Sequence, residues 1–265
     1  MYRKLRLWQT STDLKKIFLY FSLALGVLFV WQVLGVIGWL NPVIIPSLST
    51  VFRSFGEYLS SGELFRHIGV SIIRVLEGFG LAATLGIGLG LAIGLSRTLD
   101  RMTDLLIQIL KPIPPIAWIP LAIIWFGIGE ASKIFIIFIG AFYPILISVI
   151  DGIRRIDPKL IELAKILEVP RRRFIKDLIL LGILPPVMTG LRVGLGIAWM
   201  CVVAAELIAA SEGVGYLIMD ARQLSQSDVV IVGMFTIGVI GKLMDSLLRW
   251  LNKRILVWNV TYLGD

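Results

Sequence analysis

Long uncharged stretches limit what this chain can fold into more than any other feature of its sequence. Four stretches contain no Asp, Glu, Lys or Arg, and two more carry a few charged residues. Each approaches the roughly 20 residues that a helix needs to cross the hydrocarbon core of a membrane. The six stretches cover residues 17–40, 78–96, 112–129, 134–150, 185–210 and 229–248. They predict an all-α membrane protein with six transmembrane helices.

The composition supports this fold class and narrows the function. Hydrophobic residues make up 57% of the chain, and the charged fraction of 17% is well below the roughly 25% of soluble domains. We expect a single transmembrane domain over residues 1–265. With one cysteine, Cys201, and one histidine, His67, the chain offers little for a metal site or an enzyme active centre. We therefore predict no metal site, no catalytic residues and no cofactor bound by this chain.

The lysines and arginines predict the orientation. With both termini in the cytoplasm, most of the 26 basic residues face the cytoplasmic side, as the positive-inside rule requires. The basic charge is thereby explained by the bilayer, and nucleic acid is not an expected partner. Residues 1–16 read as an interfacial cytoplasmic segment or a disordered basic tail. Residues 41–67 and 211–228 are predicted outer loops, the first with a short helix at 49–59.

A polar segment at 151–184 lies between the fourth and fifth spans, on the cytoplasmic side. Asp157-Pro158 predicts a helix start, and Pro170 predicts its end by about residue 168. A second helix can begin near Arg171. The first helix has an apolar face of Ile161, Ala164 and Leu167 and a polar face of Glu162, Lys165 and Glu168. This pattern suits either a helix on lipid headgroups or a helix held by a partner.

The second span carries small residues at every fourth position: Gly78, Ala82, Gly86, Gly90 and Gly94. Such a stripe lets another helix approach closely, either within the subunit or at a sliding or dimer surface. The third span contains four prolines, which bend helices or line a transport pathway. The candidate pathway residues are Pro115, Trp118, Trp125, Arg192, Trp199, Met200 and Glu206. Each candidate also has an alternative role. The aromatic residues could pack in the core, Arg192 could anchor the helix at the headgroups, and Glu206 could form an ion pair.

Glu162-Leu163-Ala164, followed by ILP at 183–185, resembles the EAA signature of ABC-importer permeases. Four further stretches resemble the branch that imports nitrate, bicarbonate, taurine and alkanesulfonates, with alkanesulfonate permeases the closest likeness. These stretches are NPVIIPSLSTVF, LKPIPPIAWIPLAIIWFGIGEASKIF, AELIAASEGVGYLIMDAR and KLMDSLLRWLNKRILVW. The chain departs from the signature at Glu168, where glycine is usual, which leaves the geometry of that turn open.

The resemblance implies a type I ABC-importer permease fold in the cell inner membrane. It also implies an ATP-binding subunit dimer that holds ATP and Mg, a second permease copy, and a periplasmic or lipid-anchored substrate-binding protein. The expected substrate is a small anion or zwitterion: an aliphatic sulfonate, taurine, nitrate or bicarbonate. The expected contacts with the ATP-binding subunit are Glu162, Leu163, Ala164, Lys165, Leu167, Glu168, Arg171 and Arg172. A secondary transporter or channel that needs no ATPase is the alternative.

Overall fold

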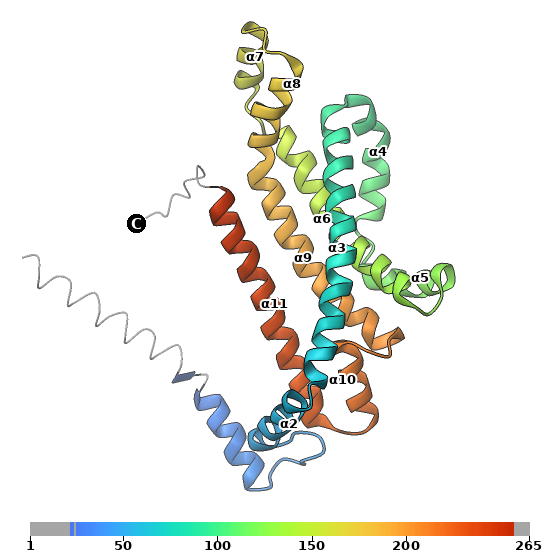
Figure 1. Cartoon of the computed structure of the whole chain (residues 1–265), viewed down its shortest axis with the longest axis vertical. Coiled ribbons are helices and arrows are strands. Elements are labelled where there is room, and N and C mark those ends of the chain that lie inside the picture. Colours follow the sequence, from blue (N-terminus) through green and yellow to red (C-terminus); the bar gives the residue numbers. More distant parts are fainter. Residues whose placement is uncertain (1–21, 24, 257–265) are drawn as a thin grey trace, which may run out of the picture. The chain divides into compact units, whose positions relative to one another are not determined.

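The structure is a computed structural model that describes residues 22, 23 and 25–256, and within them the chain is helical without strands (Figure 1). The predicted segment 1–16 lies outside the described residues. After the helix Leu25–Val36 come α2 (Leu48–Ser60), α3 (Glu63–Leu95), α4 (Arg97–Leu110), η1 (Pro115–Trp118), α5 (Ile119–Phe126), α6 (Glu130–Arg154), α7 (Pro158–Ile166), α8 (Arg171–Arg173), η2 (Phe174–Leu180), α9 (Leu181–Ala209), α10 (Val214–Gln223) and α11 (Ser227–Ile255). The element η1 is a 3₁₀ turn and η2 a π-helix.

Four helical runs are long and apolar enough to cross a membrane: α3, α6, the run Arg171–Ala209 and α11. They match four of the six predicted stretches. The third stretch differs, because α5 has only 8 residues and meets α4 at a bend of 88°. This bent pair is either one broken span or a re-entrant loop, so the prolines interrupt the helix here as expected. The count of six spans stays a prediction.

The chain packs as two compact units. The larger comprises residues 64–217 and 235–256, and the smaller comprises the residues before 64 together with 218–234. The prediction of a single domain is not tested by this division, because α10 and α11 each pass from one unit to the other.

The core of the larger unit lies where α6 and α9 run side by side (Figure 1). Its buried side chains include Ile137, Ile145 and Val202. The small-residue stripe of α3 faces α6: a Cβ built on Gly78 would meet Ile137 at 2.7 Å, and one on Gly90 would meet Val149 at 2.7 Å. The stripe therefore packs within the subunit.

The smaller unit contains α2, which confirms the predicted helix at 49–59. The Ser47 hydroxyl caps its start by accepting the N–H of Thr50, and the buried hydroxyl of Ser54 donates to Asp228. The next helix, α3, already begins at Glu63. The expected outer loop over 41–67 is therefore wrong at its end, where 63–67 continue the helix instead.

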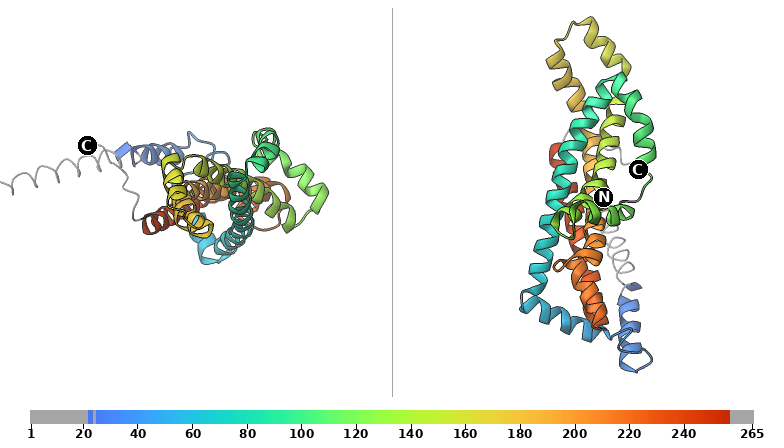
Figure 2. Two further views of the ribbon diagram at one scale, coloured as in Figure 1. Left: turned by 90° about the horizontal axis from the view of Figure 1, so that it is seen from above. Right: turned by 90° about the vertical axis from the view of Figure 1, so that its right-hand side faces the viewer.

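A helical hairpin of α7, α8 and η2 projects beyond the ends of α3 and α6 (Figure 2). It forms most of the predicted polar segment 151–184. The hairpin is attached to the membrane-length helices α6 and α9 at its two ends, so a force applied to it is transmitted directly to both.

Candidate functional site

The first helix of the hairpin starts where the sequence predicts. The Asp157 carboxylate accepts the backbone N–H of Lys159 at 2.9 Å, and Pro158 occupies the first helical position. Aspartate at this place satisfies a free N–H group, and proline has no N–H to leave unpaired. The start of α7 is therefore fixed by its own sequence, without support from buried side chains.

The same helix ends two residues before the predicted limit. Glu168 adopts a left-handed backbone with φ 47°, and its N–H reaches the Lys165 carbonyl at 3.1 Å. The N–H of Val169 reaches the Ala164 carbonyl at 3.0 Å. This pair of bonds is a Schellman motif, which usually has glycine at the left-handed position. The turn that normally requires glycine is thus kept, with glutamate in the strained position.

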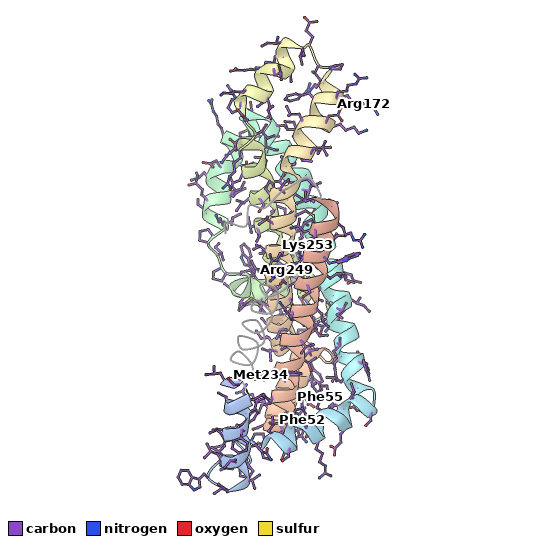
Figure 3. All side chains as sticks on the ribbon, turned by 90° about the vertical axis from the view of Figure 1, so that its left-hand side faces the viewer. Phe52, Phe55, Arg172, Met234, Arg249 and Lys253 are labelled. Atoms are coloured by element: carbon purple, nitrogen blue, oxygen red, sulfur yellow. The ribbon has the colours of Figure 1, made fainter. Side chains whose placement is uncertain are left out.

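The hairpin presents apolar side chains to its surroundings. Leu163 is 51% exposed, Ile166 77% and Leu167 65%, and α7 has no buried residue. Of the predicted apolar face, Leu167 is exposed and Ile161 and Ala164 are half-buried. The remaining predicted contacts are exposed on the same hairpin: Glu162, Lys165, Glu168, Arg171 and Arg172, the last labelled in Figure 3.

The candidate pathway residues lie in several different places. Glu206 is 1% exposed and belongs to a cluster that we call the Arg74 cluster. Ser71, Arg74, Lys133 and Glu206 are its buried members, and Glu130, with a side chain 58% exposed, is its outer member. The Glu206 carboxylate accepts hydrogen bonds from the Ser71 hydroxyl at 2.8 Å, the Arg74 guanidinium at 2.8 Å and the Gly215 N–H at 2.9 Å. Glu206 was predicted either to line the pathway or to form an ion pair, and the structure shows it in an ion pair with Arg74.

The rest of the Arg74 cluster joins α3 to α6 and to the loop before α10. Arg74 binds both carboxylate oxygens of Glu130, at 2.6 and 2.7 Å, and donates to the Glu212 carbonyl at 2.6 Å. Lys133 also donates to Glu130, at 2.8 Å. Two buried cations thus face the buried Glu206 and the exposed Glu130, and burial of Arg74, Lys133 and Glu206 is tolerated because each is paired and hydrogen-bonded. The cluster connects α3, α6 and α9.

Arg192 and Trp199 line a second place, a cavity of about 240 Å³ between α9 and α11. Arg192 pairs with Asp245 at 2.5 Å, and Asp245 also pairs with Arg249 at 2.6 Å. The Trp199 indole is 5% exposed and donates to the Ile237 carbonyl at 3.0 Å. Both side chains therefore connect the two helices.

The next three candidates, Trp118, Trp125 and Met200, lie away from both the Arg74 cluster and the cavity at Arg192. The rings of Trp118 and Trp125 are 6.4 Å apart, and Trp125 packs edge-on against Phe135. Trp125 is 54% exposed and Met200 is 71% exposed, so each offers apolar surface to lipid or to another subunit. Neither arrangement by itself identifies a pathway.

Pro115 alone of the candidates lines a cavity of about 380 Å³ among η1, α6 and α9, here called the Lys111 cavity. Its polar side chains are Lys111, Tyr143 and Ser148. Sequence reasoning noted Lys111 as a cation near a span but missed the two hydroxyls. A tyrosine and a serine in an apolar helix give no signal of the face that they occupy.

A larger cavity of about 650 Å³ lies at the base of the hairpin. It is bordered by α6, α7, the η2–α9 run and the end of α11, and its charged residues are Asp151, Arg155 and Asp157. We call it the hairpin cavity. Ser148 lines both this cavity and the Lys111 cavity.

Comparisons with known proteins agree with this arrangement. Residues 82–257 match the family described as "Binding-protein-dependent transport system inner membrane component". A Bacillus subtilis protein named as an aliphatic sulfonates transport permease, SsuC, is 42% identical over 90% of this chain and 86% of its own. The bicarbonate transport system permease protein CmpB of Synechococcus elongatus is 34% identical over 95% of this chain and 93% of its own.

The fold is similar to that of a chain in an inward-facing structure of the MetNI methionine ABC transporter. The TM-score is 0.57 at 18% identity, over 70% of this chain and 94% of that one. With its membrane-length helices, the chain is a multi-pass inner-membrane protein with the type I importer permease fold. The chain belongs to the family of binding-protein-dependent inner-membrane transport components, the permease subunits of ABC transporters.

Proposed function

We propose that this chain is the membrane-spanning subunit of an ATP-driven importer for a small anion or zwitterion. Two copies form the pathway, an ATP-binding dimer holds ATP and Mg on the cytoplasmic side, and a substrate-binding protein delivers the substrate from outside. The chain itself hydrolyses nothing, and its sequence contains no GxxxxGK[ST] phosphate loop.

The exposed apolar surface of α7 carries this proposal. Leu163, Ile166 and Leu167 project from a hairpin beyond the membrane-length helices, where water would otherwise surround them. Exposed apolar patches rimmed by charge mark protein or membrane contacts. The charges of Glu162, Lys165 and Glu168 favour a protein groove, because carboxylates are repelled by anionic headgroups.

The substrate class rests on the relatives. Their names assign an aliphatic sulfonate to one and bicarbonate to another. These compounds share a compact negative group, so we propose aliphatic sulfonates, taurine, nitrate and bicarbonate as the substrates to test first.

Movement of the hairpin supplies the coupling. When ATP closes the ATP-binding dimer, the dimer shifts α7, and α6 and α9 follow because the hairpin joins them. The helices then change which side of the membrane the pathway opens to. The required part of the interface is apolar, so a single carboxylate placed within it should disconnect the two subunits.

The test uses the complete complex in proteoliposomes with the binding protein. Ile166→Asp should lower ATP-dependent uptake at least tenfold, since burying an unpaired carboxylate costs several kcal/mol. Lys159→Gln, on the exposed first turn of the same helix, is the matched control and should transport normally. Normal uptake by Ile166→Asp would refute the docking role. Uptake that continues without the ATP-binding subunit would instead favour a secondary transporter or channel.

A further inference from the structure

The Lys111 cavity lies along the middle of two membrane-length helices. Gly140 and Tyr143 face it from α6, and Val193 and Ile197 face it from α9. Its volume of about 380 Å³ falls within the roughly 300–1,000 Å³ of typical small-molecule sites. A cavity at this depth is reached only by lipid, by water or by a molecule in transit.

The backbone around the cavity requires water or a polar ligand. Pro144 lies inside α6 and has no N–H to donate to the carbonyl of Gly140, which lines the cavity. On the opposite wall, Pro115 opens a 3₁₀ turn. Irregular backbone at membrane depth is tolerated where protein buries it or where it faces water. The Gly140 carbonyl is therefore a hydrogen-bond acceptor beside the cavity that the helix itself does not use.

The charge in the cavity is positive. Lys111 is the one charged residue that lines it, and Lys111 forms no salt bridge with any of the described residues. Arg74, Lys133 and Arg192 have carboxylate partners, and Lys242 of α11, which forms no salt bridge with the described residues, does not line this cavity. An ionised group within a membrane protein is costly and usually marks a substrate or ion path. Lys111 thus offers a positive charge without a counter-charge.

We propose that the Lys111 cavity holds the transported anion on its way through the permease. The ammonium group of Lys111 supplies the counter-charge, and the hydroxyls of Tyr143 and Ser148 donate hydrogen bonds to its oxygen atoms. The ligand class is a small oxoanion, a sulfonate, nitrate or bicarbonate. The proposal deepens the proposed function, and rests on it, by giving the permease a substrate site of its own.

Two neighbouring cavities adjoin the Lys111 cavity. One is the hairpin cavity, which is also lined by Ser148. Lys111 also borders a cavity of about 260 Å³ that contains Asp100, Asp104 and Asp151, with Arg154 paired to Asp100 at 2.6 Å. An anion that moves from Lys111 toward these carboxylates is repelled, which holds it at Lys111.

The test compares Lys111→Gln with Lys111→Arg in the complete complex. Radiolabelled ethanesulfonate, taurine and bicarbonate are supplied with the binding protein to proteoliposomes. Loss of a hydrogen bond to a charged ligand lowers affinity about tenfold or more. Lys111→Gln should therefore import at least tenfold more slowly, while the binding protein still stimulates ATP hydrolysis within twofold of wild type. Lys111→Arg should keep at least a third of the rate, since it retains the charge.

Arg101→Gln provides the matched control, because Arg101 is exposed on α4, the helix that ends just before Lys111, and lies outside the cavity. Its uptake should be unchanged. Direct binding of the same probes to the detergent-solubilised complex, without the binding protein, should be saturable and should disappear in Lys111→Gln. Normal uptake by Lys111→Gln, or binding that does not depend on Lys111, overturns the proposal.

The two proposals fail in different ways. If the wild-type complex imports none of the probes in an ATP-dependent manner, the proposed function is wrong, and Lys111-dependent binding still supports an anion site. If the wild-type complex imports a probe yet binds none without the binding protein, the cavity is not a substrate site and the importer assignment stands.

Discussion

Replacing Glu206 with glutamine removes one charge from the Arg74 cluster and keeps nearly the same side-chain shape. Glu206 is 1% exposed and accepts hydrogen bonds from Ser71, Arg74 and Gly215. After the substitution, Arg74 and Lys133 face Glu130 alone. The cluster then holds two buried cations and one carboxylate, the exposed Glu130.

The size of the effect follows from this geometry. Breaking a buried ion pair by removing one partner costs about 3–5 kcal/mol. The amide of glutamine still accepts one of the bonds, so we expect the lower end, about 3 kcal/mol. For a chain of this size, each kcal/mol lowers the melting temperature by about 2–4 °C, which gives a decrease of about 6–12 °C.

Cys201 makes the measurement direct. It is the one cysteine of the chain, it is 3% exposed, and it lies on α9 with Glu206. A thiol-reactive fluorescent dye therefore reports the unfolding of this core when the purified chain is heated in detergent. Gly213→Ala is unsuitable as a control, because Gly213 has φ +121° and a Cβ there would overlap the Glu206 carboxylate.

Glu212→Gln is the matched control. Glu212 lies in the same loop, but its partly exposed carboxylate pairs with Arg66 at the surface, and only its carbonyl reaches Arg74. An exposed ion pair contributes about 0–1 kcal/mol, so the melting temperature should fall by no more than about 4 °C. A difference of about 2 °C between the two melting temperatures corresponds to about half a kcal/mol. If Glu206→Gln melts within about 2 °C of Glu212→Gln, the stabilising role assigned to the Arg74 cluster is wrong.

Two further predictions concern glycine geometry. Gly90→Ala should lower the melting temperature by several degrees, since overpacking costs about 1–3 kcal/mol and its Cβ would meet Val149 at 2.7 Å. Gly88→Ala is the control, because a Cβ on Gly88 would have no atom within 4 Å, and its melting temperature should be unchanged or higher. Equal melting temperatures for Gly90→Ala and Gly88→Ala would contradict the packing of α3 on α6. Glu168→Gly should relieve about 1 kcal/mol of left-handed strain and slow amide exchange at Val169, whereas faster exchange there would show that glutamate stabilises the turn.

Local features could be predicted from the sequence. Asp157-Pro158 marks the start of α7, and the pattern at 49–59 marks α2, because caps and helical periodicity depend on neighbours only a few residues away. The departure from the family signature at Glu168, where glycine is usual, also pointed to a real feature. In the structure, Glu168 is the left-handed residue that ends α7.

Long-range pairing could not be predicted. Arg74 and Glu206 are 132 residues apart, and the sequence marked each as a separate charged residue near a span. Their partnership depends on the packing of three helices and a loop. For the same reason the second span was predicted only at 78–96, whereas α3 begins at Glu63 and includes the buried Arg74.

The pathway candidates show the same limit. Arg192, Trp199 and Glu206 were grouped by chemistry and position along one span, but they face different neighbours around α9. Tyr143 and Ser148 were missed because no periodicity distinguishes a hydroxyl in a cavity from a hydroxyl in contact with lipid. Which side of a membrane helix faces a cavity is decided by the helices around it.

The most direct test of this account is a photocross-linking residue placed at Ile166, within membranes that contain the complete transporter. We predict a cross-link between Ile166 and the ATP-binding subunit, because its side chain is 77% exposed and it is the last residue of α7 in the hairpin. The same residue at Ile124, equally exposed at 77% on α5, should not reach that subunit. Cross-links from Ile166 to lipid alone, in membranes where the ATP-binding subunit is present, would contradict the account.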